Sequence, residues 1–127
     1  MAAEAALVAR RCLDTTETGE LNLSHCKLTQ IPDAVFILVR SVEVTRCDLS
    51  HNVITRIPPK LGQQFPQLTE LNVSNNNLSD LPAELDVMTS LVTLNMAANS
   101  FKILPEVLRR MSTLRNLHAA NNDIPGK

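Results

Sequence analysis

Apolar residues in this chain recur in a fixed pattern. From Leu68 the sequence reads LTELNVSNNNLSDLPAELDVM, with apolar side chains at positions 1, 4, 6, 11, 14, 18 and 21 of the stretch. From Leu91 it reads LVTLNMAANSFKILPEVLRRM, with apolar side chains at the same positions. Both stretches have asparagine at position 9 and proline at position 15. They are therefore two successive copies of one unit of 23 residues.

This unit accounts for nearly the whole chain. It begins again in an incomplete copy at the end, and it occurs upstream in copies of 24 and 26 residues. A fixed period of this length is typical of solenoids, in which each repeat is one coil that buries its apolar face only against its neighbours. We therefore predict an N-terminal segment, 1–17, followed by five repeats at 18–43, 44–67, 68–90, 91–113 and 114–127.

Each repeat combines a strand pattern with a helix pattern. The alternation of Leu71, Asn72 and Val73 predicts a short strand with one buried and one exposed face. Pro82 suits the first turn of a helix, and Leu85 follows at helical spacing. We therefore expect parallel strands on one side of the solenoid and short helical segments on the other.

Position 9 of the repeat, which we call the slot, holds a polar residue although the other recurring positions are mostly apolar. An amide there can donate to and accept from backbone groups of adjacent coils, which would otherwise be unpaired inside the solenoid. Asn76 takes this slot, whereas Asn75 and Asn77 flank it in a turn, where asparagine tolerates unusual backbone angles. Cysteine can fill the slot as a small donor. The predicted structural ladder is Cys26, Asn52, Asn76, Asn99 and Asn122.

The unit LxxLxLxxN/CxLxxLPxxLxxL resembles the leucine-rich repeat, in the 23-residue intracellular LP form found in Ras-pathway scaffold proteins, over 18–127. The resemblance implies an α/β fold, a leucine-rich-repeat solenoid. This is a right-handed coil with short parallel strands on its concave face and short helical or 3-10 segments on its convex face. It also implies a non-enzymatic protein–protein interaction module, an adaptor or regulatory scaffold that binds a protein partner on the concave face.

The concave face is expected to be polar. Its charged residues belong to the first three repeats, and small neutral residues follow near Ala97 and Ala98. It carries no aromatic hot-spot residue, which favours a modest interface or a surface with a missing half. The alternative is that these positions form only a soluble strand surface. The candidate partner-binding residues are Glu20, Asn22, Arg46, Asp48, His51, Glu70, Asn72, Asn75, Asn95, Asn116 and His118.

The N-terminal segment differs from the repeats. Residues 3–13, AEAALVARRCL, are good helix formers and place Ala6, Leu7 and Leu13 roughly on one side. Because the first coil of a solenoid needs a cover, we expect a capping helix here. A targeting segment and a partner-binding helix are the alternatives.

The last repeat stops at NNDIPGK, so that Leu114, Leu117 and Ile124 have no following coil in the sequence. This predicts either a truncated form of a longer chain or an uncapped C-terminal edge. Such an edge would pair with another repeat protein or with a second copy of the chain.

Composition and charge exclude several function classes. The net charge is −1 without a basic block, which argues against nucleic acid, and no apolar run approaches the ~18 residues of a membrane span. The three cysteines form no CxxC pair, which is typical of reduced thiols and favours a cytoplasmic protein, with the nucleus as an alternative. No phosphate-binding loop, nucleophile elbow or HExxH motif indicates an enzyme, and no cofactor is expected.

One group of residues has the chemistry of metal ligands. His25 and His51 stand at the same repeat position, next to Asp48, and could share a zinc ion. Two histidines and one carboxylate are few ligands for a zinc site. We therefore interpret His25 and His51 as a pair of exposed histidines beside the ladder, and we assign no metal site. Cys26 and Cys47 take inward positions, which favours core packing over redox chemistry.

Overall fold

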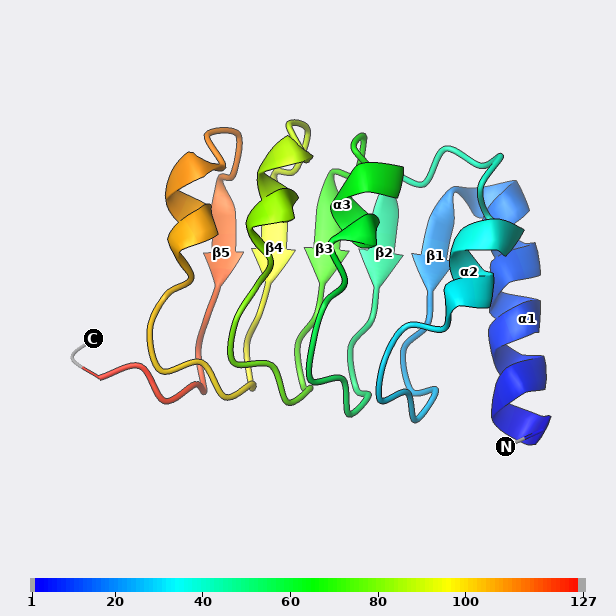
Figure 1. Cartoon of the computed structure of the whole chain (residues 1–127), viewed down its shortest axis with the longest axis horizontal. Coiled ribbons are helices and arrows are strands. Elements are labelled where there is room, and N and C mark those ends of the chain that lie inside the picture. Colours follow the sequence, from blue (N-terminus) through cyan, green and yellow to red (C-terminus); the bar gives the residue numbers. More distant parts are fainter. Residues whose placement is uncertain (1, 126–127) are drawn as a thin grey trace.

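The computed structural model describes residues 2–125, so the predicted outer bounds at residues 1 and 127 lie outside the described residues. Its described part contains a five-stranded sheet in the order β1-β2-β3-β4-β5, in which neighbouring strands are parallel. Figure 1 shows the strands side by side in one row, with the chain advancing by one coil between neighbours. The strands are β1 (Glu20–Asn22), β2 (Arg46–Asp48), β3 (Glu70–Asn72), β4 (Thr93–Asn95) and β5 (Asn116–His118).

A short helical segment follows each of the first four strands, and the last three of these segments pack against one another along the molecule (Figure 1). Each segment begins directly after a proline, which has no backbone N–H to leave unpaired at a helix start. The first two are α-helical and the last two are 3-10 turns. With the N-terminal helix, the segments are α1 (Ala2–Thr18), α2 (Asp33–Leu38), α3 (Lys60–Gln64), η1 (Ala83–Val87) and η2 (Glu106–Arg110).

The core runs along the whole solenoid as a file of apolar side chains. Leu71 and Val73 of the strand pattern are buried, as are Leu85 and Met88 of the helical pattern. Between the coils the largest fully buried side chains include Phe65. Because each coil packs only on its neighbours, burial at one position repeats in the next coil, which is the origin of the sequence period.

The buried asparagines bridge neighbouring coils. Asn76 donates through Nδ2 to the carbonyl of Leu49 in the preceding coil (2.9 Å) and to that of Val73 in its own coil (3.1 Å). Its Oδ1 accepts the N–H of Ile54, again from the preceding coil (3.0 Å). Each amide thus pairs backbone groups that lie inside the solenoid. The same arrangement recurs at Asn52, Asn99 and Asn122.

Cys26 occupies the slot of the first coil and makes a smaller set of contacts. Its Sγ donates to the carbonyl of Ser24 within the same coil (3.4 Å), and its N–H donates to Oδ1 of Asn52 in the next coil (3.0 Å). Within the described residues a helix, and not a coil, precedes this one, so the slot has no second turn of backbone to bridge. A thiol is therefore sufficient where the other coils use an amide.

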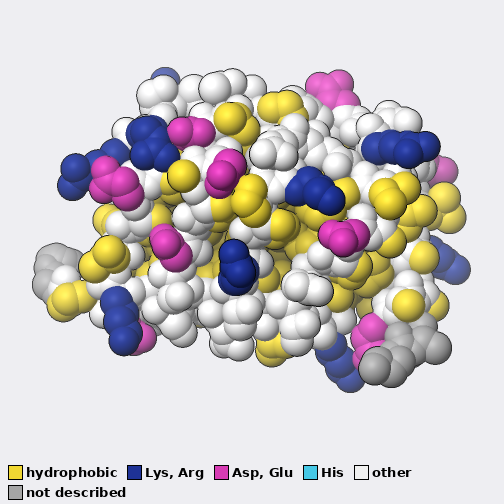
Figure 2. All heavy atoms as spheres, viewed as in Figure 1, with side chains coloured by type: hydrophobic (Ala, Val, Ile, Leu, Met, Phe, Trp, Pro, Cys, Tyr) yellow, Lys and Arg dark blue, Asp and Glu magenta, His cyan; other side chains and the backbone are white. Residues whose placement is uncertain are grey.

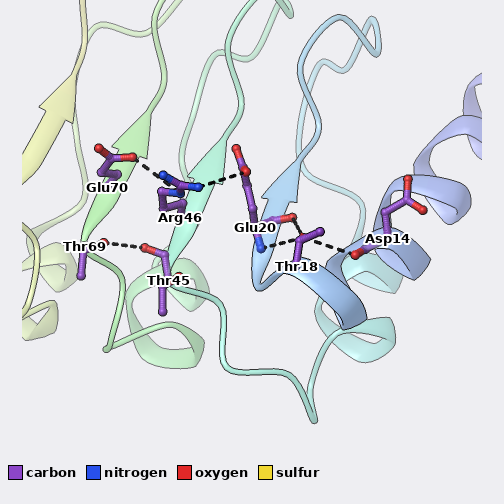
Figure 3. A network of polar contacts seen from close by, with 7 residues as sticks. All are labelled: Asp14, Thr18, Glu20, Thr45, Arg46, Thr69 and Glu70. Carbon is purple, nitrogen blue, oxygen red and sulfur yellow. Dashed lines mark hydrogen bonds and ion pairs between the residues drawn. The ribbon is translucent and has the colours of Figure 1, made fainter.

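Helix α1 covers the outer edge of β1. Arg11 Nη1 donates to the carbonyl of Asn22 (2.7 Å), and Thr18 Oγ1 accepts the N–H of Glu20 (3.1 Å; Figure 3). Both backbone groups lie on the side of β1 away from β2, since backbone groups of successive residues alternate between the two edges of a strand. Side chains of α1 thus occupy hydrogen-bonding groups that another strand would use.

The buried face of α1 differs from the predicted one. Val8, Cys12 and Thr15 are buried, and the predicted Leu7 is partly buried against the core. The predicted Leu13 is instead 65% exposed, and Ala6 is also exposed. The buried residues follow the i, i+4, i+7 spacing of one helix face. Thr15 can be buried on this face because its hydroxyl donates a hydrogen bond to the carbonyl of Arg11 (2.9 Å).

The surface mixes apolar and charged side chains. Figure 2 shows one face, on which hydrophobic side chains gather in a band across the middle and charged side chains of both signs are scattered around it. No block of a single charge is visible on this face. Among the described residues, no helix combines the length and apolarity that crossing a membrane requires.

We predict that Asn76→Ala lowers the free energy of unfolding by about 1–3 kcal/mol, because it leaves buried backbone groups of two coils unpaired. Chemical denaturation measures this change. The matched control is Asn77→Ala, an exposed neighbour in the same turn, for which we expect a change within about 0.5 kcal/mol. Equal losses in both variants would contradict the bridging role of Asn76.

Candidate functional site

The sheet register arranges the outward strand residues in two columns. The residue between them on each strand is buried in β1 to β4, so the columns face solvent on one side of the sheet, which we call the strand face. The first column is Glu20, Arg46, Glu70, Thr93 and Asn116. The second column is Asn22, Asp48, Asn72, Asn95 and His118.

A shallow cavity of about 220 Å³ lies on the strand face and extends over strands from β1 to β5. We call it the strand-face cavity. Its polar lining comes from both columns, so the register gathers residues that are far apart in the sequence into one surface. The polar lining residues are Glu20, Arg46, Asp48, Glu70, Asn72, Thr93, Asn95 and His118.

Ion pairs link the first column across three strands (Figure 3). Arg46 lies between two carboxylates, with Nη2 at 3.6 Å from Glu20 Oε1 and Nε at 3.9 Å from Glu70 Oε1. The three side chains are 56%, 41% and 52% exposed, respectively. Exposed pairs at such distances contribute little to stability. These charges are therefore accessible to a partner.

The second column also shapes the turns that follow the strands. Asn72 Oδ1 accepts both the N–H (3.0 Å) and the hydroxyl (2.7 Å) of Ser74. Asn22 and Asp48 do the same with serines two residues on, and Asn95 accepts the N–H of Ala97. One oxygen of each residue is thus used by its own turn. The prediction from the sequence did not include this role, although the recurring serine two residues downstream was a visible signal.

His51 and Asn75 lie in the turns and not on the strands. Both adopt left-handed backbone angles, with φ of 58° and 56°. The equivalent residues His25, Ala98 and Asn121 share this conformation. Asparagine adopts it readily, so Asn75 has a conformational role in addition to its predicted place among the partner-binding residues.

The rings of His25 and His51 stack in parallel, with centroids 4.4 Å apart and an interplanar angle of 8°. Imidazole nitrogens coordinate metals in the plane of the ring. The two stacked rings therefore direct their nitrogens along nearly parallel lines that do not converge on one ion. Among the described residues, no group of three or more His, Cys, Asp and Glu side chains could hold a metal.

The cysteines are packed in the core. Cys47 lies under the strand-face cavity, and burial raises the pKa of its thiol well above the usual range, with the charge of Asp48 as a second cause. Burial also raises the pKa of Cys12 and of Cys26. A protonated, buried thiol is a poor nucleophile, so these side chains act as small core residues.

The comparison with known families matches this geometry. The chain matches the family described as leucine rich repeat over residues 17–78 and 66–124. It belongs to the leucine-rich repeat family. This fold is typically a non-enzymatic protein-interaction fold, and the strands of stacked repeats form its extended binding surface.

Known leucine-rich repeat proteins share parts of the sequence. Toll-like receptor 3 of Bos taurus is 36% identical over 77 residues, which cover 61% of this chain and 8% of the receptor. Tsukushi of Gallus gallus is 30% identical over 71 residues, 56% of this chain and 19% of that protein. The chain thus spans less than a fifth of the length of these relatives.

Solved structures confirm the predicted leucine-rich-repeat solenoid. A leucine-rich repeat protein of Leptospira interrogans superposes with a TM-score of 0.69 at 22% identity, covering 91% of this chain and 34% of that one. The predicted α/β architecture, with short parallel strands and short helical or 3-10 segments, is therefore correct.

We predict that Ala98→Asn raises the free energy of unfolding by about 0.5–1 kcal/mol, because asparagine relieves the left-handed strain of alanine at this position. Denaturant unfolding measures the gain. Ala120→Asn is the control, since Ala120 is exposed and its φ is not positive. A gain of the same size in the control would show that the added amide, and not the backbone angle, is responsible.

Proposed function

We propose that this chain is a cytoplasmic adaptor or regulatory scaffold that binds a protein partner on its strand face, without catalysis, metal or cofactor. The observation that carries the proposal is the strand-face cavity, around which the register collects polar side chains from all five strands. Several of these side chains are half-buried and anchored by their own turns. A surface of this kind is already organised before a partner binds, which lowers the entropy lost on binding.

The chemistry of the strand face favours a moderate, polar interface. Its columns hold carboxylates, amides, one guanidinium and one imidazole, and no tyrosine or tryptophan occurs in the chain. Aromatic anchors supply much of the binding energy in tight interfaces. We therefore expect a reversible complex in which hydrogen bonds and charges determine the choice of partner.

The repeat type supports the proposed location. The 23-residue period and the LP pair resemble intracellular leucine-rich repeats, including leucine-rich repeat-containing protein 20. The three cysteines are free thiols buried in the core, as is common in reducing compartments. We propose the cytoplasm on this basis, with the nucleus as the alternative.

We predict that Thr93→Lys, in the lining of the strand-face cavity, reduces recovery of the protein partner about ten-fold by placing a bulky cation in the interface. The measurement is quantitative affinity purification from cytoplasmic extract with mass spectrometry. Glu84→Lys is the control, because Glu84 is exposed on η1, away from the strand face. Both variants should fold, which circular dichroism checks. Equal recovery of every bound protein by both variants would refute a strand-face partner.

A second candidate function is pairing through β5. At equivalent positions Leu71 and Leu94 are buried, whereas Leu117 of β5 is 39% exposed. The outer edge of β5 also presents backbone groups that can pair with another strand. We propose that this edge pairs with a second copy or with another repeat protein.

If β5 mediates association, Leu117→Lys should reduce it with little loss of stability, because the side chain is already partly in water. Leu71→Lys should instead unfold the domain, since it buries a charge in the core. Light scattering after size exclusion measures association, and denaturant unfolding measures stability. A wild-type chain that stays monomeric at all concentrations would contradict pairing of β5 with a second copy.

A further inference from the structure

Asp48 is the exception in the second column. The other residues of this column that shape a turn are Asn22, Asn72 and Asn95. Asp48 Oδ1 accepts the N–H of Ser50 at 2.9 Å, and the asparagines make the same bond at 3.0–3.1 Å. The turn therefore needs a side-chain oxygen and not a negative charge. The charge of Asp48 is left without a structural role in its own turn.

No basic side chain neutralises this carboxylate. Arg46 lies on the same strand, yet its ion pairs go to Glu20 and Glu70 on the flanking strands. Within residues 2–125, Asp48 forms no ion pair. The strand-face cavity is thus lined by three carboxylates and one guanidinium, which leaves it a local charge of −2, and Asp48 is half-buried within it. A partly desolvated carboxylate in such a cavity attracts a cation more strongly than an exposed one does.

The charge is confined to one half of the strand face. All four charged side chains belong to β1, β2 and β3, whereas β4 and β5 present Thr93, Asn95, Asn116 and His118. Five strands at a spacing of about 4.8 Å extend over about 19 Å, which about six residues of extended chain can cross. An extended segment can therefore place a charged residue at one half of the face and uncharged residues at the other.

We propose that the partner presents a lysine or arginine side chain to Asp48, from an extended segment whose following residues are uncharged and lie over β4 and β5. This inference rests on the proposed function of the strand face and names the chemistry of its partner. Glu20 and Glu70 flank the cation, and Arg46 restricts the site to a single inserted basic side chain by repelling a second one.

The test uses the isotope-labelled 127-residue chain and a capped octapeptide in which one lysine precedes alternating serine and glycine. The peptide is titrated at low salt and followed by amide chemical shifts. We expect shifts across the strand face, in β1 to β3 around the lysine and in β4 and β5 under the uncharged residues, with this peptide and none with its glutamate counterpart. Asp48→Asn should weaken binding about five-fold, the size of one partly exposed ion pair. Its stability should be unchanged, since asparagine makes the same turn in three other coils.

Two further variants complete the design. Glu84→Gln removes a carboxylate far from the strand face and should leave the affinity unchanged. Arg46→Gln removes the competing cation and should strengthen binding about two-fold or more. It also tests the site independently should Asp48→Asn fail to fold. Equal weakening by Asp48→Asn and Glu84→Gln, or shifts spread over all exposed carboxylates, would overturn the inference.

The outcomes for the two proposals are separable. If a cellular partner is lost with Thr93→Lys but binds Asp48→Asn with wild-type affinity, the strand face is the binding surface and the inference about its partner's cation is wrong. If no partner depends on Thr93, the proposed function itself fails, whatever the peptide shows.

Discussion

The buried amide that joins one coil to the next is the interaction on which the rest of this structure depends. A solenoid turns its backbone inward once per repeat, and the carbonyl and N–H groups there have no strand or helix partner. Asn76 pairs such groups of two coils at once, and its counterparts do so along the molecule. The amide thereby ties each coil to its neighbour at the spacing that the hydrogen bonds of the parallel strands also require. The columns of the strand face are a result of this spacing.

Much of the architecture could be predicted because every coil repeats the same contacts. The strands, the helical segments after proline and the slot all recur once in each repeat of 23 to 26 residues. Local deviations could not be predicted in the same way. Alanine gives no sign of the left-handed backbone at Ala98, and Ser74 reads as an exposed strand residue although Asn72 draws it into a turn. On α1, the helical pattern grouped Leu13 with Leu7 on one face, but Leu13 lies on the solvent side.

The sequence predicts which residues form the candidate site, but it does not predict which hydrogen bonds their side chains make. Alternation along the strands indicates which side chains face solvent, and the parallel register then brings them together. It does not indicate that one oxygen of Asn72 is already bonded within the turn, which leaves only the other end of the amide for a partner. In this protein the same side chains stabilise the coil and face the cavity. Residues of the strand face are therefore held more rigidly than their exposure suggests.

Helix α1 has a consequence for how copies of this chain can assemble. By bonding the outer edge of β1 through Arg11 and Thr18, it blocks the addition of a strand there. A sheet with two open edges can join head to tail without limit and grow into fibres, whereas a sheet with one open edge cannot. Two copies meeting at β5 would have to face each other about a twofold axis, with their edge strands antiparallel, and growth would stop at the dimer. A helix that completes the core thus also closes this edge of the sheet to a further strand.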